Sequence, residues 1–373
     1  MRVHIVDPSA YTPPYDHALC AALAQQGAQV QLHTSRFAYG PLPAPAGYQR
    51  VEDFYSRAAR ARSAGVRRAI KLAEHVPDML AYGRRARAAD VVHFQWLALQ
   101  YVDGMLLPRG RPLVLTAHDV LPREPRAGQR AAQRRLYERF DAIVVHSDHG
   151  ARRLTGELGV PAARVHVIAH GALEHLAATS SLTPPSAANG VARVLFFGLL
   201  RPYKGLDVLL DAWEGIEGAE LWIVGMPRMD ISELRARAGA SVHFVSRFVD
   251  DAELAEQFRR ADLVVLPYRQ ADQSGVLFTA LAFGTPLLLS DVGGFPEIAA
   301  TGAARCVPAG DVGALRSELR TLLGDPRELS RMRERARAAA RGRYSWEAVA
   351  RATMQLYESL LDGSKSSLGD DGR

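Results

Sequence analysis

Two segments in the second half of the chain decide its fold: VLFFGLLRPYKGLDVLL at 194–210 and LVVLPYRQADQSGVLFTALAFGTPLLLSDVGGFPE at 263–297. Each reads as a buried strand, then a loop rich in glycine and cations, then a helix. In such a unit the loop brings backbone N–H groups and the positive end of a helix dipole to one place, which suits a phosphate. Arg201 and Lys204 add fixed positive charge, so a nucleotide diphosphate is the first ligand to expect.

The whole chain repeats this alternation of strands and helices. Strands that are apolar on both faces and alternate with helices predict parallel sheets covered on both sides, here two doubly wound α/β domains in 373 residues. Ligands of such sheets bind at the carboxyl ends of the strands, so we expect the site in a cleft between the two domains. The expected strands are 2–6, 28–33, 90–94, 112–116, 141–146 and 164–169 in the first half, and 193–197, 220–224, 241–245, 262–266, 286–290 and 304–307 in the second.

The domain boundaries follow from changes in composition. Ser, Pro, Ala and Gly replace the periodic pattern before residue 190, which predicts a first domain over 1–175, a linker over 176–190 and a second domain over 191–345. A final amphipathic helix is expected over 346–362, packing back on the first domain, and a disordered tail over 363–373.

Positive charge is concentrated in the first half. Residues 1–190 carry a net charge of +8, whereas the chain as a whole carries +6. The excess lies in 57–87 and 123–139, both helical in pattern. It has two interpretations. The first is a surface for an anionic acceptor or for anionic lipid headgroups, and the second is solvated helix faces in an arginine-rich protein. Nucleic acid is not expected as a partner, because no binding module or aromatic interleaving is present.

Other features bear on location and redox chemistry. The N-terminal sequence lacks the basic head and apolar stretch of a signal peptide, and no run of about eighteen apolar residues occurs. We therefore expect a cytoplasmic protein, and one of the two interpretations of its charge adds peripheral attachment to the inner face of the membrane. Cys20 and Cys306 stand far apart in apolar segments, which indicates core residues and not a disulfide or metal framework.

The two loops differ from the common nucleotide motifs. The loop from Gly198 to Gly205 lacks the spacing of a triphosphate P-loop and of a dinucleotide fingerprint. Its two cations can still converge on a diphosphate and stabilise it as it leaves; the alternative is an ordinary turn with two exposed cations. In the second loop Ser274 is predicted to be the N-cap of a helix over 275–283, so that the first N–H groups of that helix point outward.

Longer stretches extend this reading to nearly the whole chain. FGLLRPYKGLDVLLDAW, LWIVG, SGVLFTALAFGTPLLLSDVGGFPE and YSWEAVA, with LTAHD, IVVHSDHGARRL and VHVIAHG in the first half, resemble the nucleotide-sugar-dependent glycosyltransferases of family 4. The resemblance implies the GT-B fold, two Rossmann-like domains facing a central cleft. It further implies a donor held by the second domain, an acceptor held by the first, retention of anomeric configuration, and no metal or other cofactor.

The resemblance also assigns donor residues. Arg201 and Lys204 would grip the donor diphosphate, and the resemblance implies further contacts with the base from Phe248 and Val249 and with phosphate and sugar from Ser274, Gly275 and Val276.

One departure from the family pattern concerns the sugar. Many members carry two glutamates across this helix, whereas here Thr279 stands at the second position and Ala271 near the first. Thr279 could hydrogen-bond a ribose hydroxyl, and Asp272 or Gln273 could reach the sugar.

The candidates in the first half also follow strands. His118 comes after the strand 112–116, and the resemblance places it beside the transferred sugar; the alternative is a loop histidine bonded to backbone. Asp16, with Tyr15 next to it, is the candidate for meeting an acceptor hydroxyl, and its alternative role is an N-cap. The twelve histidines show no metal-ligand spacing.

Together these features predict a hexosyltransferase. It would move a hexosyl group from a nucleoside-diphosphate sugar to a hydroxyl of a saccharide, a lipid-linked molecule or a small molecule, in the synthesis of glycans, glycolipids or glycosylated metabolites. The residues alone leave retention or inversion open, since Asp16 or His118 could serve as the base that inversion needs. Two rival classes remain: a non-hydrolysing sugar-nucleotide epimerase and a nucleotide-sugar-binding homologue without catalysis.

Overall fold

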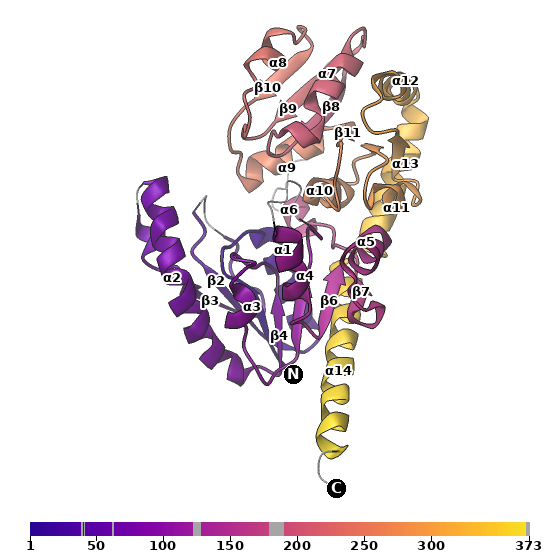
Figure 1. The fold of residues 1–373 in the computed structure, drawn as a ribbon. Helices are drawn as coiled ribbons and strands as arrows, with labels where there is room; N and C mark the ends of the chain where they lie inside the picture. The colour runs from indigo at the N-terminus through magenta and orange to yellow at the C-terminus, as the bar shows by residue number, and fades with distance from the viewer. Residues whose placement is uncertain (39, 41, 62, 122–127, 179–189, 371–373) are drawn as a thin grey trace. The chain divides into compact units, whose positions relative to one another are not determined.

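The protein consists of two compact α/β units (Figure 1). Met1–Ala169 and Trp346–Arg373 form the first unit, and His170–Ser345 form the second. The computed structural model describes residues 1–38, 40, 42–61, 63–121, 128–178 and 190–370. Most of the expected linker, 179–189, lies outside the described residues, and the segment just before it is the short helix α6 (Glu174–Ala178) of the second unit.

The first unit is built on a parallel sheet of seven strands in the order β3-β2-β1-β4-β5-β6-β7. Its strands are β1 (Arg2–Asp7), β2 (Gln29–Ser35), β3 (Gln49–Phe54), β4 (Val91–Phe94), β5 (Leu113–Thr116), β6 (Ala142–Val145) and β7 (Val165–Val167). Its helices are α1 (Pro13–Gln25), α2 (Ala64–Arg85), α3 (Asp103–Leu106), α4 (Gln129–Tyr137), α5 (Asp148–Leu158) and α14 (Trp346–Asp370).

The second unit has a parallel sheet of six strands in the order β10-β9-β8-β11-β12-β13. Its strands are β8 (Ala192–Phe197), β9 (Ala219–Val224), β10 (Val242–Val245), β11 (Leu263–Leu266), β12 (Leu287–Ser290) and β13 (Ala304–Val307). Besides α6, its helices are α7 (Leu206–Trp213), α8 (Ser232–Ala236), α9 (Asp251–Arg260), α10 (Gly275–Phe283), α11 (Phe295–Ala299), α12 (Val312–Leu323) and α13 (Pro326–Arg341). The two doubly wound parallel sheets predicted from the sequence are thus confirmed.

Strand order determines which loops meet. In each unit the chain starts at a central strand, builds outward to one edge, then returns to the other side of its starting strand. This reversal falls between β1 and β4 in the first unit and between β8 and β11 in the second. At such a switch point the loops at the carboxyl ends of the two strands diverge and leave room for a ligand. The loops that follow β8 and β11 are the two from which the sequence argument began.

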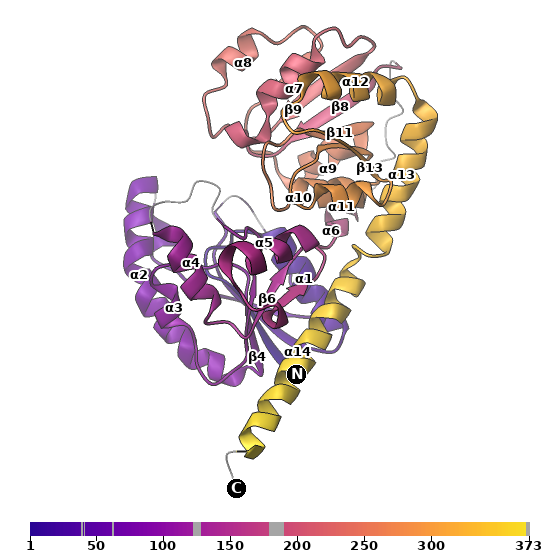
Figure 2. The same ribbon diagram turned by 45° about the vertical axis from the view of Figure 1, so that its right-hand side comes forward.

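Two elements differ from the sequence expectations. Strand β3 was missed because it is an edge strand that is largely polar and partly exposed, and so lacks the apolar character of the other strands. The expected tail from 363 is wrong in part, since α14 continues to Asp370; Gly363 weakens the helix, but no proline stops it. The last helix packs against α1 and is thus part of the first unit (Figure 2).

Burial keeps several histidines of the first unit neutral, among them His93 and His4. His93 lies between the hydroxyls of Tyr357 on α14 (2.6 Å from Nδ1) and Thr116 (2.7 Å from Nε2). Burial, and then the nearby His146, lower the pKa of His93 to about 3. Burial, and then the charge of His33, lower the pKa of His4 to about 4. Neither side chain takes up a proton in the folded protein near pH 5, whereas in the unfolded chain both do so below about pH 6.5.

We therefore predict that the protein loses stability as the pH falls from 7 to 5. The unfolded state then binds protons that the folded state does not, so each such histidine lowers the free energy of unfolding by about 2 kcal/mol at pH 5. Urea unfolding at pH 7, 6 and 5 measures this change. His93→Gln keeps hydrogen-bonding capacity but cannot bind a proton. It should reduce the slope of the free energy of unfolding against pH by the equivalent of up to one bound proton. An unchanged slope would show that His93 does not contribute.

Candidate functional site

In the second unit, Gly198 brings the two phosphate-suited loops to one point. Gly198 follows β8 with a positive φ of 110°. A Cβ added there would lie 2.8 Å from Nζ of Lys204 and 3.3 Å from Cγ2 of Val276, at the start of α10. The Lys204 ammonium and the N-terminus of α10 therefore converge on the same glycine, and a larger residue would displace the lysine.

Lys204 is held in place by an aromatic ring. Lys204 is only 7% exposed, and its Nζ lies 4.9 Å from the centre of the Tyr268 ring. A cation over an aromatic face is attracted by the ring quadrupole. The Tyr268 hydroxyl in turn lies 3.4 Å from the hydroxyl of Ser274, so one ring links the cation to the second loop. The side chain of Arg201, the other predicted cation, is exposed.

The two loops are also locked together through their backbones. The N–H of Arg269 donates to the carbonyl of Tyr203, and its guanidinium forms an ion pair with Asp207 at 2.5 Å. Gly205 has a φ of 66°, and a Cβ there would lie 2.0 Å from the carbonyl oxygen of Pro267. These contacts fix the position of Lys204 from both sides.

The helix α10 begins where the sequence predicted, but its cap differs. Ser274 occupies the N-cap position with an extended backbone, yet its side chain makes no capping hydrogen bond. A hydroxyl that is not used for capping can meet a ligand. The first N–H groups of any helix lack intrahelical acceptors, so those at Gly275 and Val276 can bind an anion.

Other predicted donor residues lie near the carboxyl ends of β10 and β11. Phe248 is 46% exposed and Val249 is buried. The hydroxyl of Thr279 donates to the carbonyl of Gly275 at 2.9 Å, so it can offer a ribose hydroxyl only its lone pairs. Asp272 is buried, and its carbonyl accepts the N–H of Gly294.

Two side chains at this edge of the sheet carry polar atoms without a protein partner. Within the described residues, Oε1 of Gln273 and Oγ of Ser246, which follows β10, are buried and make no hydrogen bond. Buried polar atoms are rarely left unpaired, so each marks a place where a ligand or water completes the network. Ser246 was not predicted; its signal was a polar residue directly after an apolar strand.

In the first unit, the ring of His118 is held by four side chains. Nε2 lies 3.2 Å from Oε1 of Gln95, and Nδ1 lies 3.2 Å from Nε2 of His146. The ring stacks on Trp96 at a centroid distance of 4.9 Å and an interplanar angle of 12°. The edge of Tyr15 packs against it at 4.8 Å. Its orientation is thus determined by packing and by both nitrogens.

The position of the His118 proton follows from its neighbours. Burial lowers the pKa of His146 to about 4, so that ring is neutral. Its Nδ1 lies 3.0 Å from the carbonyl oxygen of Ile168 and must donate to it, which leaves Nε2 as an acceptor. Nδ1 of His118 therefore carries a hydrogen. The atom of Gln95 that faces Nε2 of His118 is the amide oxygen, which can only accept a hydrogen bond. The amide nitrogen of Gln95 is buried and has no partner in this orientation, so a flipped amide would place that nitrogen as a donor to Nε2 of a neutral His118.

Gln95 and Trp96 were missed by the sequence analysis. Both follow β4 at the switch point of the first sheet, and that position was the available signal. The indole N–H of Trp96 donates to the hydroxyl of Thr12 at 2.9 Å, and the exposed ring of Tyr11 lies 5.3 Å away. The two rings form an aromatic wall next to His118.

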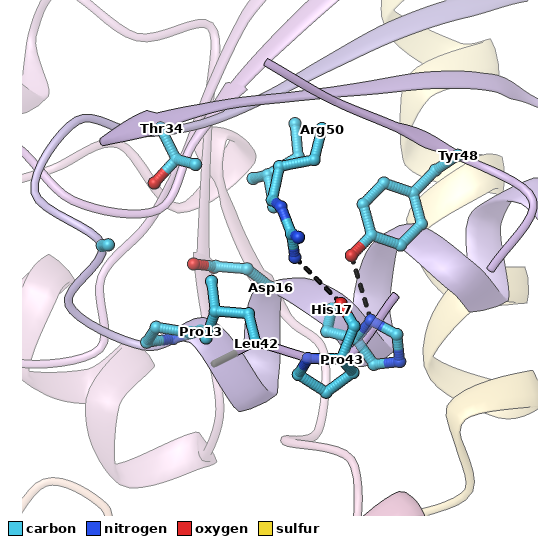
Figure 3. A pocket seen from close by; sticks show the side chains of 10 residues that line it. Pro13, Asp16, His17, Thr34, Leu42, Pro43, Tyr48 and Arg50 are labelled. Carbon is cyan, nitrogen blue, oxygen red and sulfur yellow. Dashed lines mark hydrogen bonds between the residues drawn. The ribbon is translucent and has the colours of Figure 1, made fainter. Parts of the chain in front are cut away.

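Asp16 is part of a buried carboxyl pair. Helix α1 begins at Pro13 with Thr12 as its N-cap, so the alternative role of Asp16 as an N-cap is wrong. Burial, and then the charge of Asp7, raise the pKa of Asp16 well above its usual range. Asp7 accepts N–H groups from the β1–α1 loop, including that of Thr12 at 3.2 Å, so the proton of the pair resides on Asp16. Figure 3 shows Asp16 at a small pocket that Thr34 and Arg50 also line.

Tyr15, the other predicted acceptor residue, lies inside the unit. It is buried against His118, His146 and Trp346. Its position is that of a residue that orients the histidines, and contact with an acceptor stays a prediction.

Among the described residues, no group of three His, Cys, Asp or Glu side chains is placed to hold a metal ion. No helix in the described part of the chain is long and apolar enough to cross a membrane.

Two family models match the chain. One, described as glycosyl transferases group 1, matches residues 191–325, and the other, described as glycosyltransferase family 4, matches residues 15–172. Each model thus covers most of one sheet.

Curated relatives match over part of their length. A phosphatidyl-myo-inositol mannosyltransferase of Mycobacterium leprae (strain TN) is 40% identical over 186 residues, which is 46% of this chain and 48% of the relative. A GDP-mannose:glycolipid 4-beta-D-mannosyltransferase of Xanthomonas campestris pv. campestris is 30% identical over 224 residues, 53% of this chain and 60% of the relative. The chain therefore spans less than two thirds of these relatives.

Solved structures share the fold over nearly the whole chain. Sucrose-phosphate synthase from Thermosynechococcus elongatus superposes with a TM-score of 0.75 at 20% identity, covering 97% of this chain and 100% of the other. The Anabaena protein Alr3699/HepE in complex with UDP-glucose superposes with a TM-score of 0.72 at 19% identity, covering 96% and 100%. The two family models and the curated relatives show that the chain belongs to the family 4 glycosyltransferases, and the two parallel sheets and the solved structures show that it has the GT-B fold.

Proposed function

We propose that this protein transfers a hexosyl group from a nucleoside-diphosphate sugar to an acceptor hydroxyl, with retention of anomeric configuration. The observation that carries the proposal is the convergence of the buried Lys204 ammonium and the N-terminus of α10 on Gly198. This place offers a fixed cation and backbone N–H groups that a diphosphate would satisfy. An ordinary turn with two exposed cations would not bury Lys204.

The proposed chemistry exchanges one bond at the anomeric carbon for another. The bond from that carbon to the diphosphate breaks, and a bond to the acceptor oxygen forms on the same face. The acceptor proton goes to the departing diphosphate, whose added negative charge Lys204, Arg201 and the N–H groups at Gly275 and Val276 stabilise. These groups neutralise the leaving group, so the proposal needs no metal or other cofactor.

The remaining predicted residues have proposed roles around this centre. Phe248 and Val249 border the base, Thr279 accepts from the ribose, and Asp272, Gln273 and Ser274 contact phosphate and sugar. In the first unit Nε2 of His118 contacts the transferred sugar, and this contact replaces the one between Nε2 and Gln95. Asp16 and Tyr15 shape the acceptor side, Asp16 as a protonated carboxyl and therefore not as a ready base.

We further propose that the acceptor is a polyol or glycolipid hydroxyl met at a membrane surface. The two curated relatives are named for action on phosphatidyl-myo-inositol and on a glycolipid. The basic first half of the chain suits peripheral contact with anionic lipids at the cytoplasmic face.

A panel of donors tests the function. We expect the protein to release nucleotide from one of UDP-glucose, GDP-mannose or a dTDP-sugar when inositol or a glycolipid is added, also in the presence of EDTA. Proton NMR of the first-formed product should show the anomeric configuration of the donor; the opposite configuration would contradict retention. Epimerised donor without acceptor would support an epimerase, and tight donor binding without turnover would support a non-catalytic homologue.

The diphosphate grip predicts the effect of two substitutions. Lys204→Ala should lower kcat/KM by about 100-fold or more, because a preorganised charge at the leaving group is lost. Gly198→Ala should also weaken UDP or GDP binding, since its Cβ displaces the ammonium. Kinetics and thermal shift with nucleotide diphosphates measure both effects.

Matched control substitutions distinguish loss of diphosphate binding from a general loss of stability. Arg327→Ala removes an exposed cation from α13, and Gly218→Ala places a Cβ at a positive φ of 71° with nothing within 4 Å. Both controls should bind diphosphate normally. Normal turnover by Lys204→Ala would show that the diphosphate is bound elsewhere.

His118 should act on the transfer step and not on the diphosphate. We predict that His118→Ala lowers kcat by roughly 100-fold while the affinity for UDP or GDP stays unchanged, because its contacts lie in the first unit. Gln95→Leu should give a smaller loss with the same pattern, as expected for a positioning residue. Loss of diphosphate affinity in His118→Ala, measured by calorimetry, would refute this assignment.

A further inference from the structure

The loop between β1 and α1, residues 8–12, is held by one buried carboxylate. Asp7, the last residue of β1, is buried and accepts backbone N–H groups from this loop. The donors are Ser9 at 3.2 Å, Tyr11 at 2.5 Å and Thr12 at 3.2 Å. Hydrogen bonds to an ionised acceptor are roughly twice as strong as those between neutral groups. One side chain therefore fixes the path of the chain from the sheet into α1.

The loop has a strained residue at its centre. Ala10 has a φ of 49°, in the left-handed region that is unfavourable for residues other than glycine. Such a residue persists only where surrounding contacts impose its conformation. Here the N–H of Ala10 donates to the carbonyl of Asp7 at 3.2 Å, and the hydroxyl of Thr34 donates to the same carbonyl at 2.8 Å. Asp7 thus imposes the loop conformation through both its carbonyl and its carboxylate.

Asp16 gives the same carboxylate a further hydrogen bond. The carboxyl groups of Asp7 and Asp16 are hydrogen-bonded to each other, and both residues are buried. This hydrogen bond requires a proton, and the backbone donors around Asp7 favour its ionised form, so Asp16 is the donor. An amide at position 16 could replace that donor. An amide at position 7 would turn its NH₂ group toward an N–H of the loop in either orientation, because both oxygens of Asp7 accept such groups.

The loop is connected to His118 through Trp96. Thr12 is the N-cap of α1, yet its side chain makes no capping hydrogen bond and its hydroxyl accepts the indole N–H of Trp96 at 2.9 Å. The indole ring stacks on His118 with the ring centres 4.9 Å apart. The position of the His118 ring therefore depends on Thr12, and that of Thr12 depends on Asp7.

We infer that Asp7 positions His118 for the transfer step. By holding Thr12, and through it Trp96, Asp7 keeps the imidazole in the orientation from which Nε2 meets the transferred sugar. A displacement of about 1 Å at a reacting centre can cost about 100-fold in rate, so a buried residue can still limit the reaction. The inference rests on the role proposed above for His118, and it does not involve the diphosphate site of the second unit.

Two asparagine variants test the inference through kinetics. Asp7→Asn should lower kcat by about tenfold or more, while the affinity for UDP or GDP stays unchanged. Asp16→Asn can still donate to Asp7, so its loss in kcat should be at least about threefold smaller than that of Asp7→Asn. Normal turnover by Asp7→Asn, or equal losses in the two variants, would overturn the inference.

Asp90→Asn is the matched control. Asp90 accepts the backbone N–H of Arg2 at 2.7 Å, at the opposite end of β1. The control therefore changes a carboxylate that holds backbone, but it leaves the loop at 8–12 untouched, and its kcat should equal that of the wild type. A loss as large as that of Asp7→Asn would show a general effect on the first unit and would overturn the inference.

A double-mutant cycle tests whether Asp7 acts through Trp96. Trp96→Phe keeps an aromatic ring but lacks the N–H that donates to Thr12. If the two residues act in series, Asp7→Asn with Trp96→Phe should lose no more in kcat than the larger single loss, whereas independent effects would multiply and overturn the inference. Thr12→Val leaves the buried carboxyl pair intact and should lower kcat by about threefold or more, so it decides the matter should Asp7→Asn fail to fold.

The NMR signal of the His118 ring supplies a readout that does not depend on turnover. In protein with isotopically labelled histidine, stacking on the indole should shift the Hε1 proton of His118 upfield, and His118→Ala identifies the signal by its loss. Asp7→Asn and Thr12→Val should move this signal, whereas Asp90→Asn should not. A signal that stays in place in Asp7→Asn would overturn the inference. Absence of transfer by the wild-type chain would instead refute the proposed function, and the signal would still decide whether Asp7 positions His118.

Discussion

The close packing of two loops at the switch point of the second sheet is the constraint on which the candidate donor site depends. Gly205 places the backbone of the β8–α7 loop against the carbonyl of Pro267, where a Cβ would lie 2.0 Å from the oxygen. Because the loops touch through backbone, Lys204 can lie under Tyr268 and still reach Gly198. A bulkier residue at 205 would separate the loops, and the cation, the ring and the N-terminus of α10 would no longer share one place.

Much of the architecture could be predicted because parallel sheets have a strong signature. Runs such as LVVL at 263–266 are apolar on both faces, and no other common element of that length requires this. Strand β3 lacked that signature because an edge strand is solvated along one side. The end of α14 was misplaced for a related reason, since composition indicates where packing stops and not where backbone hydrogen bonds stop.

For the site, the sequence identified loop positions but not their partners. Gly198, Lys204 and Ser274 could be named because each lies in a loop that joins a strand to a helix and is of a type suited to anions. Tyr268, which holds Lys204, is separated from it by sixty-odd residues of chain, and Gln95 and His146 approach His118 from neighbouring strands. The proton on Asp16 likewise depends on Asp7, nine residues away on another element. Contacts between residues that are distant in sequence can be recognised only in the folded structure, whereas residue types in the loops after strands can be read from the sequence.

Helix α2 shows the same limit in a different form. Its pattern of apolar and polar residues identifies an amphipathic helix, and the usual assumption buries the apolar side. Here Glu74, His75 and Asp78 find fixed partners on η1 (Ala58–Arg60) or next to it, and on α3, while Met79 and Tyr82 on the same side of the helix pack into the core. Val66, Leu72, Val76 and Leu80 are left outside, next to exposed arginines. The orientation of an amphipathic helix is thus set by which of its faces finds partners in the fold, and hydrophobicity alone does not determine it.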